Sequence, residues 1–231
     1  MILFGGVLIY LSLLGAAAGF LTVLRPRRRR KGLVLMGLGL LGFLTGVYLP
    51  VSETRVAVPR TRLDEFAPVF QFSEFHSIAV NASKERIDSA IRKVTPEEIR
   101  FFQTLMRIRF LETPAGRPIL GSFTAGTFQA LADHPGREIV VGRAGNGRTA
   151  RAMTAAEFKA FRRPQMIKIA MNFRIEETDS SHCLVTTETR VYAVGTHALH
   201  GFATYWRMIY PGSSLIRREW LRAIKVRAEA D

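Results

Sequence analysis

Two absences narrow the possibilities at the outset. The first fifty residues contain no aspartate or glutamate, and the whole chain of 231 residues has a single cysteine, Cys183. One cysteine excludes an internal disulfide. It also removes the usual compositional marker of an oxidising compartment, so the location of the protein has to be argued from other features.

The acid-free stretch consists of two apolar runs, residues 2–24 and 33–50, separated by the basic loop RPRRRRK at residues 25–31. About 20 apolar residues of helix cross the hydrocarbon core of a bilayer, and both runs come close to this length. A cleaved signal peptide would carry basic residues before its apolar run and a small-residue cleavage site after it, and neither is present. We therefore predict that residues 1–50 form a transmembrane helical hairpin with two spans.

The loop also suggests an orientation. Its six cations favour the cytoplasmic side of the membrane, which would leave both chain ends outside. The segment after the second run opposes this with only Arg55, Arg60 and Arg62. We expect a multi-pass protein of the cell membrane whose soluble domain lies on the outer face, periplasmic or extracellular.

Glycines are frequent in both apolar runs. In an antiparallel hairpin, Gly15 and Gly19 fall level with Gly37, Gly39 and Gly42, and small residues let helix backbones approach closely in lipid. Packing within the hairpin is the first interpretation. A second small pair, Gly42 and Gly46, leaves open a homo-oligomer that forms through the transmembrane glycines.

The formal net charge of +14 is partly a property of the loop. Outside it, 27 basic residues face 19 acidic ones, a net charge of about +8. Such an excess suits anionic lipid headgroups or a solvated basic surface. Nucleic acid is not an expected partner, because the cations are scattered and no familiar nucleic-acid-binding signature is present.

The soluble part has a readable order of elements. Its clearest boundary is a capping box, in which Thr95, Pro96 and Glu98 open a helix over residues 96–110. A strand over 75–82 and a short helix after Ser83 precede it, and an irregular connection over 112–126 follows. Further strands are expected over 127–132, 137–143, 148–153, 167–175 and 183–194, with a helical turn over 155–161. A final helix is interrupted at Pro211–Gly212 and restarts at Ser213 or Ser214.

Two strands show which side chains face inward. In MIKIAMNFRI, the residues Ile169, Met171 and Phe173 share one face, as in a half-buried strand. In the next strand, Thr187 and Thr189 lie on one side and Glu188 and Arg190 on the other. A charge pair at the surface is the expected role of Glu188 and Arg190.

This order of elements resembles the helix-grip fold of the START-like, or SRPBCC, superfamily, which includes lipid-transfer proteins, pollen-allergen-like proteins and polyketide cyclases. The resemblance covers about residues 72–229 and includes the segments HSIAVNASKERIDSAI, LVTTETRVYAV and FATYWRMIYPGSSLIRREWLRAI, which look like those of bacterial START-like proteins of unassigned role. It implies an α+β fold in which a curved antiparallel sheet grips a long C-terminal helix around an apolar cavity. The expected organisation is a hairpin at 1–50, a juxtamembrane linker at 51–71 and a START-like domain at 72–231.

If the resemblance holds, the inward faces supply a ligand site. Its expected wall is Ile169, Met171, Phe173, Thr187, Thr189, Phe202 and Trp206. An apolar wall with a few hydroxyls suits a lipid or another hydrophobic small molecule. We expect binding without catalysis, because no catalytic motif is present, and we expect no cofactor.

Two alternatives remain open. One is a cyclase- or aromatase-like enzyme that uses an inward polar residue such as Thr187 or His76. Another is a membrane-tethered scaffold with a filled core that docks a partner protein. A zinc site could be drawn from His182, Cys183, His197 and His200, but their spacing matches no known ligand motif, and no metal is expected.

Overall fold

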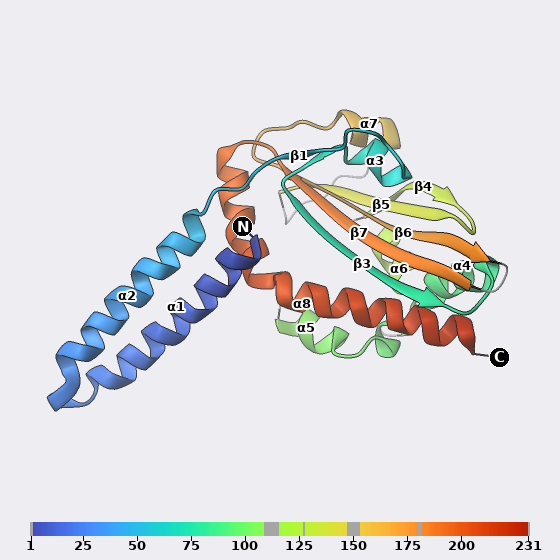
Figure 1. Ribbon diagram of the computed structural model, residues 1–231. Helices are drawn as coiled ribbons and strands as arrows, with labels where there is room; N and C mark the ends of the chain where they lie inside the picture. The colour runs from blue at the N-terminus through green and yellow to red at the C-terminus, as the bar shows by residue number, and fades with distance from the viewer. Residues whose placement is uncertain (1, 109–115, 127, 147–152, 180–181, 231) are drawn as a thin grey trace. The chain divides into compact units, whose positions relative to one another are not determined.

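The structure is a computed structural model that describes residues 2–108, 116–126, 128–146, 153–179 and 182–230. The chain forms two compact units (Figure 1). One comprises Met1–Ser52 and Thr196–Pro211, and the other comprises Glu53–Gly195 and Gly212–Asp231. Helix α8 (Thr196–Glu229) contributes to both units.

The first unit contains an antiparallel pair of helices, α1 (Ile2–Val23) and α2 (Arg29–Tyr48), joined by the short 3-10 helix η1 (Pro26–Arg28) (Figure 1). Both are long and apolar enough to cross a membrane. The predicted pair of apolar helices is therefore confirmed. Helix α2 begins four residues before the predicted apolar run, because the basic residues Arg29–Lys31 continue its helical backbone.

Glycines bring α1 and α2 into backbone contact. A Cβ atom at Gly39 would lie 2.8 Å from both the Ala16 amide nitrogen and the Ser12 carbonyl oxygen. A Cβ at Gly19 would lie 2.8 Å from the Met36 amide nitrogen. The expected packing of these two glycines within the hairpin is confirmed, whereas Gly15 and Gly37 have nothing within 4 Å of the corresponding position.

This difference gives a matched test of the hairpin. Substitution Gly39→Val should destabilise the packing of α1 on α2 by roughly 1–3 kcal/mol, because the added methyl groups collide with backbone atoms. Substitution Gly37→Val places the same side chain in open space and should change stability little. Unfolding of both full-length variants in detergent, followed by circular dichroism, compares them. Equal loss of stability in the two variants would contradict this account of the packing.

The first part of α8 belongs to the same unit, and its Arg207 caps the C-terminal end of α2. Arg207 is buried, and its guanidinium donates to the carbonyl oxygens of Val47 at 2.8 Å and Leu49 at 2.6 Å. The last carbonyls of a helix have no partner within the helix, so these bonds satisfy groups that water would otherwise solvate. The Tyr10 hydroxyl donates to the Met208 carbonyl oxygen.

The predicted break in the C-terminal helix is wrong. Helix α8 continues for 34 residues with Pro211 in its interior. A proline inside a helix removes one backbone hydrogen bond and strains the turn before it, but tertiary packing on both sides can hold the helix together.

The second unit is built on a five-stranded antiparallel sheet. The strand order is β3-β7-β6-β5-β4. The bounds are β3 (Phe72–Val80), β4 (Gln129–His134), β5 (Glu138–Gly145), β6 (Ile167–Asp179) and β7 (His182–Ala193). The predicted α+β helix-grip fold, with an antiparallel sheet and a long C-terminal helix after an apolar helical hairpin, is confirmed.

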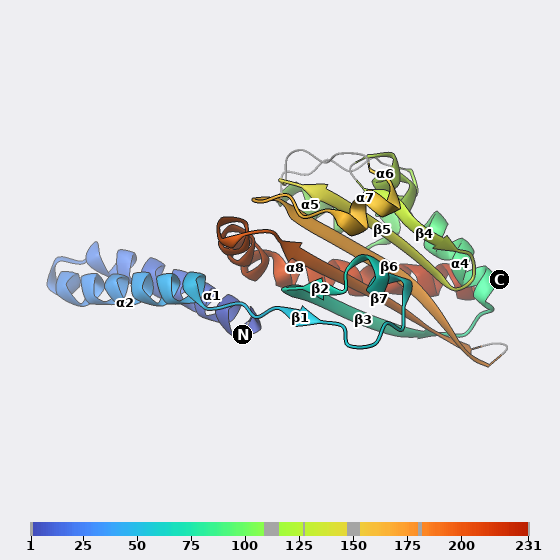
Figure 2. The same cartoon turned by 90° about the horizontal axis from the view of Figure 1, so that it is seen from above.

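Each face of the sheet has its own core. The face called inner here packs on the second half of α8 and on α4 (Lys84–Lys93), α5 (Phe102–Ile108) and α6 (Ile119–Ala125). The outer face carries the short helices α3 (Arg62–Phe66) and α7 (Ala155–Ala160). Figure 2 shows both short helices from above, over the strands.

Several local expectations need correction. The capping box at Thr95 and Glu98 is confirmed, but it opens only the 3-10 helix η2 (Pro96–Glu98). The backbone then turns through Phe101, whose φ is +61°, so the expected helix over 96–110 is split before α5. The expected irregular connection over 112–126 contains α6. Residues 148–152 of the expected hairpin strand lie outside the described residues.

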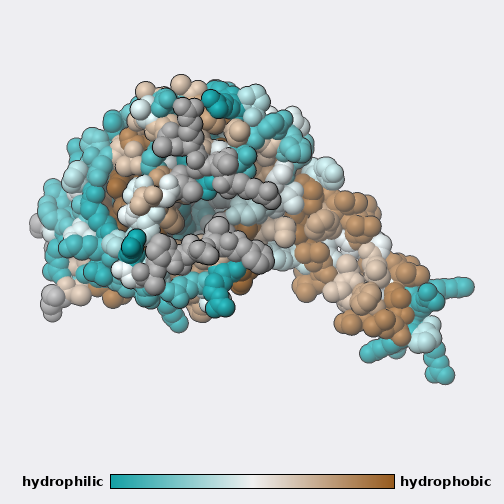
Figure 3. Space-filling view, turned by 180° about the vertical axis from the view of Figure 1, so that it is seen from behind, coloured by the Kyte–Doolittle hydropathy of each residue, from teal (hydrophilic) through white to brown (hydrophobic). Residues whose placement is uncertain are grey.

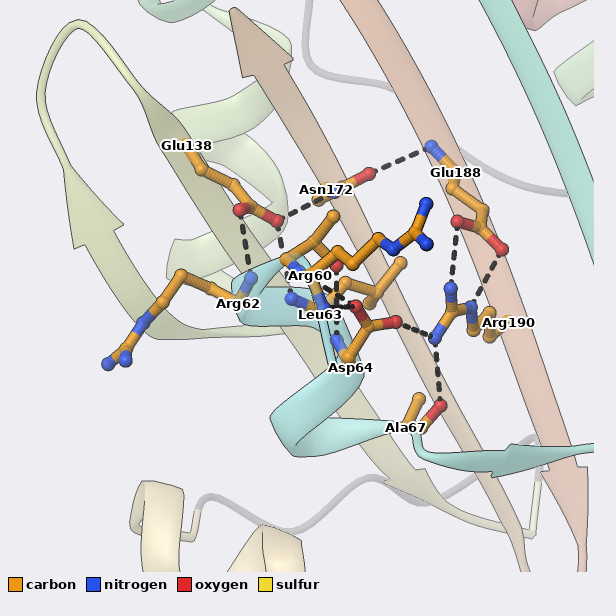
Figure 4. A network of polar contacts seen from close by, with 10 residues as sticks. Arg60, Arg62, Leu63, Asp64, Ala67, Glu138, Asn172, Glu188 and Arg190 are labelled. Atoms are coloured by element: carbon orange, nitrogen blue, oxygen red, sulfur yellow. Dashed lines mark hydrogen bonds and ion pairs between the residues drawn. The ribbon is translucent and has the colours of Figure 1, made fainter. Parts of the chain in front are cut away.

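Residues 51–71, expected as a linker, contain α3 and the small strands β1 (Thr54–Arg55) and β2 (Val69–Phe70). Arg190 of β7 ties this segment to the outer face of the sheet (Figure 4). Its guanidinium pairs with Asp64 at 2.6 Å and Glu188 at 2.7 Å and donates to the Ala67 carbonyl oxygen at 3.2 Å. The expected Glu188–Arg190 pair exists, but Arg190 is buried rather than at the surface because α3 covers it.

A second buried carboxylate completes this attachment. Glu138 of β5 accepts from the backbone amides of Arg62 at 2.9 Å and Leu63 at 3.2 Å and from the Asn172 side-chain amide at 2.7 Å (Figure 4). Two buried carboxylates thus anchor α3 on the sheet, and both have their hydrogen bonds satisfied. We interpret this network as structural.

Candidate functional site

The inner face of the sheet is largely apolar but carries a row of polar side chains at its β3–β7 pair. Antiparallel pairing sets Glu74 opposite Thr189 and His76 opposite Thr187. Directly opposed residues of neighbouring strands project from the same face of a sheet. Four polar side chains therefore share the face that packs on α8.

Glu74 is the centre of this group, with only 3% of its surface exposed. Its carboxylate lies 2.9 Å from His76 Nε2 and accepts a hydrogen bond of 2.7 Å from the Ser213 hydroxyl of α8. The Ser214 hydroxyl lies 3.4 Å from His76 Nε2. A carboxylate, an imidazole and two hydroxyls thus form one connected cluster between the sheet and α8.

A second helix residue extends the polar group toward the middle of the sheet. Arg217 donates to the Thr189 hydroxyl at 2.8 Å and contacts Met171 Sδ at the same distance. Its guanidinium also lies 5.6 Å from the centre of the Trp220 ring. We call Glu74, His76, Thr189, Ser213 and Arg217 the inner polar cluster.

Aromatic side chains flank this cluster. The Phe173 ring of β6 meets the Trp220 ring edge-on at a centroid distance of 4.9 Å. Phe123 of α6 contacts the same indole at 5.9 Å and stacks on Phe128 at 5.4 Å. The indole N–H of Trp220 is buried, and none of the described residues accepts a hydrogen bond from it. Buried polar groups are normally satisfied by protein, water or a ligand.

The surface of this unit is hollowed on the face shown in Figure 3. A polar group set in an apolar, aromatic surround is the usual composition of a small-molecule site. Apolar surface supplies most of the binding energy there, and the few polar groups orient the ligand.

The seven residues expected from the sequence fall into two sets. Met171, Phe173, Thr187 and Thr189 are buried on the inner face, and Ile169 is half-buried on the same face. Phe202 and Trp206 lie in the other compact unit, where their rings stack at 5.6 Å. The expectation that all seven line one pocket stays a prediction.

Three members of the inner polar cluster were not predicted as site residues from the sequence: Glu74, Ser213 and Arg217. The signal for Glu74 was present, since it alternates with Phe72 and His76 along the strand. The four residues once considered for zinc do not form a cluster: among the described residues, no group of three histidine, cysteine or acidic side chains is placed to hold a metal ion.

No family model and no curated protein matches the sequence. Solved structures match it at low identity. One is the di-domain ARO/CYC protein BexL from the BE-7585A biosynthetic pathway, which is 15% identical with a TM-score of 0.35. The alignment covers 68% of this chain and 46% of BexL, so the chain spans about half the length of that protein.

Two further matches cover nearly all of the compared protein. A START superfamily protein from Mycobacterium smegmatis is 14% identical with a TM-score of 0.31, over 68% of this chain and 97% of that one. Norcoclaurine synthase from Thalictrum flavum, in complex with dopamine and hydroxybenzaldehyde, is 12% identical with a TM-score of 0.36, over 78% and 99%. These matches agree with the expected START-like resemblance, and at such low identity and TM-score they transfer no activity to this chain.

Proposed function

We propose that this protein is a membrane-anchored binding protein for a hydrophobic small molecule of the lipid class, and that it holds its ligand without transforming it. The inner polar cluster, set among the aromatic side chains of the inner face, is the observation that carries the proposal. Such a surround suits an amphiphile whose polar group meets Arg217 and Glu74 while its apolar part lies against rings such as Trp220.

The two apolar helices support the anchoring. Beyond the basic residues Arg29–Lys31 at the start of α2, the side chains that the two helices expose are almost all apolar, including Leu3, Phe4, Leu14, Val34 and Leu41. Exposed hydrophobic surface of this extent belongs in lipid. We place the domain on the outer face of the membrane because the basic loop favours the cytoplasmic side. Digestion of the domain by protease added to intact cells tests this side assignment.

The binding proposal is tested by identifying any small molecule that co-purifies with the protein. The full-length protein, purified in detergent, is extracted with organic solvent, and the extract is examined by mass spectrometry. We expect one class of amphiphile to be present in stoichiometric amount. Substitution Arg217→Met should reduce its retention at least tenfold, because it removes the donor that we assign to the ligand's polar group.

The matched control is Arg222→Met, which changes an exposed arginine on the same helix. It should retain the ligand as the unmodified protein does. Equal retention by the two variants, or extracts that contain only the purification detergent, would refute the proposal.

One observation favours a second candidate, an enzyme of the cyclase type. Glu74 and His76 form a hydrogen-bonded carboxylate–imidazole pair, an arrangement that can orient a general base. Substitution His76→Gln separates the two functions. A binding protein would keep its ligand, whereas an enzyme would keep substrate binding and lose turnover.

A further inference from the structure

The outer face of the sheet has a second group of polar side chains, distinct from the network that anchors α3. A pocket of about 140 Å³ lies there. Its lining is Arg55, Pro68, Val69, Arg162, Lys168 and Tyr192. Three of these six residues are basic and none is acidic.

Lys168 is the unusual member. It projects from β6 on the outer face and is only 4% exposed. Its ammonium donates weakly to the Lys159 carbonyl oxygen, at 3.4 Å, and lies 4.6 Å from the centre of the Phe158 ring. Among the described residues no carboxylate pairs with Lys168, although buried lysines normally have such a partner. Burial, with the Arg162 guanidinium adding to it, lowers the pKa of Lys168 to about 8.

Arg162 lies beside Lys168, and its guanidinium has N–H groups that it does not use in hydrogen bonds to the described residues. One nitrogen, Nη1, donates to the carbonyl oxygens of Lys159 at 3.2 Å and Phe161 at 2.7 Å. The guanidinium also lies 5.9 Å from the centre of the Tyr192 ring. No carboxylate among the residues described pairs with Arg162. Arg55 is the partly neutralised member, since it pairs with Glu53 at 2.8 Å.

We propose that this pocket binds a phosphate group, with Lys168 and Arg162 as its two principal ligands and the Tyr192 hydroxyl beside them. Two uncompensated cations match the charge of a phosphate dianion, and a guanidinium with free edges suits its oxygens. The volume suffices for a tetrahedral anion with a few waters, since each water takes about 30 Å³ in the liquid.

The phosphate can belong to a free anion or to a lipid headgroup, and two features make the lipid accessible. Arg162 also lines a larger pocket of about 540 Å³ with apolar residues such as Met153, Phe161 and Met166, which could receive an acyl chain. Arg55 follows the end of α2 at Tyr48 by seven residues, which span at most about 25 Å. The lipid source rests on the membrane anchoring proposed above, whereas phosphate binding itself does not.

The test uses the full-length protein in neutral detergent micelles, where binding does not depend on a bilayer. Inorganic phosphate and dihexanoyl phosphatidic acid are each titrated and followed by calorimetry, with dihexanoyl phosphatidylcholine as the control lipid. We expect saturable binding of at least one phosphate ligand and none of the control lipid. Binding of phosphatidic acid alone identifies the lipid source, and equal binding of inorganic phosphate identifies the free anion.

Variants decide whether the pocket is the site. Lys168→Met and Arg162→Gln should each weaken phosphate binding at least tenfold. Lys93→Met removes an exposed lysine outside the pocket and should leave the affinity unchanged. Arg217→Met, on the inner face, should also leave it unchanged, which separates this site from the one proposed above. Absence of saturable phosphate binding, or equal weakening by Lys168→Met and Lys93→Met, would overturn the inference.

Discussion

Substitution Arg190→Ala is expected to lower the free energy of unfolding by about 3–5 kcal/mol. The guanidinium is buried and holds together Asp64, Glu188 and the Ala67 carbonyl oxygen. Burial raises the pKa of Asp64, but hydrogen bonds from the Arg60 backbone, Arg190 and Thr61 outweigh this effect and leave the pKa below its ordinary value. The carboxylate is therefore charged at neutral pH. Removal of Arg190 leaves a buried negative charge without its cation.

The control is Arg174→Ala, which removes an arginine from the neighbouring strand. Arg174 pairs with Glu176 in a half-exposed position, and exposed ion pairs contribute about 0–1 kcal/mol. Denaturant unfolding of both full-length variants, followed by tryptophan fluorescence, gives the comparison. A loss below about 1 kcal/mol for Arg190→Ala would show that this network does not hold α3 on the sheet.

Substitution Lys168→Met is expected to act in the opposite direction and raise the free energy of unfolding at pH 7 by roughly 1–3 kcal/mol. The pKa of Lys168 is about 8 in the folded protein against 10.5 for an ordinary lysine, so folding works against the charged ammonium. Methionine keeps the length of the side chain and removes the charge. The contact with the Phe158 ring offsets part of the gain.

The stability advantage of Lys168→Met should depend on pH in one direction. Because the pKa of Lys168 is lowered on folding, the penalty is complete below pH 8 and disappears as pH rises to about 10.5. The advantage of Lys168→Met should therefore shrink over this range. Tyr192 in the same pocket is common to both proteins, so the difference between them isolates the lysine. An advantage that stays constant with pH, or that Lys93→Met reproduces, would contradict the assignment.

Local patterns in the sequence were enough to predict the fold. Two acid-free apolar runs gave the helical pair, and the alternation around Met171 gave the central strand of the sheet. These patterns work because a helix or strand with one buried face must repeat its apolar residues at a fixed interval. The interruption at Phe101 could not be predicted in this way, since a left-handed backbone at a phenylalanine has no signature in composition.

Two members of the inner polar cluster, Glu74 and Ser213, were missed for identifiable reasons. The strand was expected to start at Phe75, three residues after its true start, which left Glu74 outside the pattern. The helix was expected to break at Pro211–Gly212 and to restart at Ser213 or Ser214, which placed Ser213 at a helix end rather than within a continuous helix. The buried contact of Arg190 with Asp64 joins residues 126 positions apart, and such a pairing leaves no trace in local periodicity.

The sharing of α8 between the two compact units has a practical consequence for anyone who prepares the sheet domain separately. A chain shortened to begin at Glu53 would retain residues 196–211 but lose the helices that pack on them. Arg207 would then lack the carbonyl oxygens of Val47 and Leu49, and the unit that buries Phe202 and Trp206 would be lost. Aggregation of such a fragment would result from the apolar side chains of residues 196–211, which would be exposed without α1 and α2, and not from instability of the sheet.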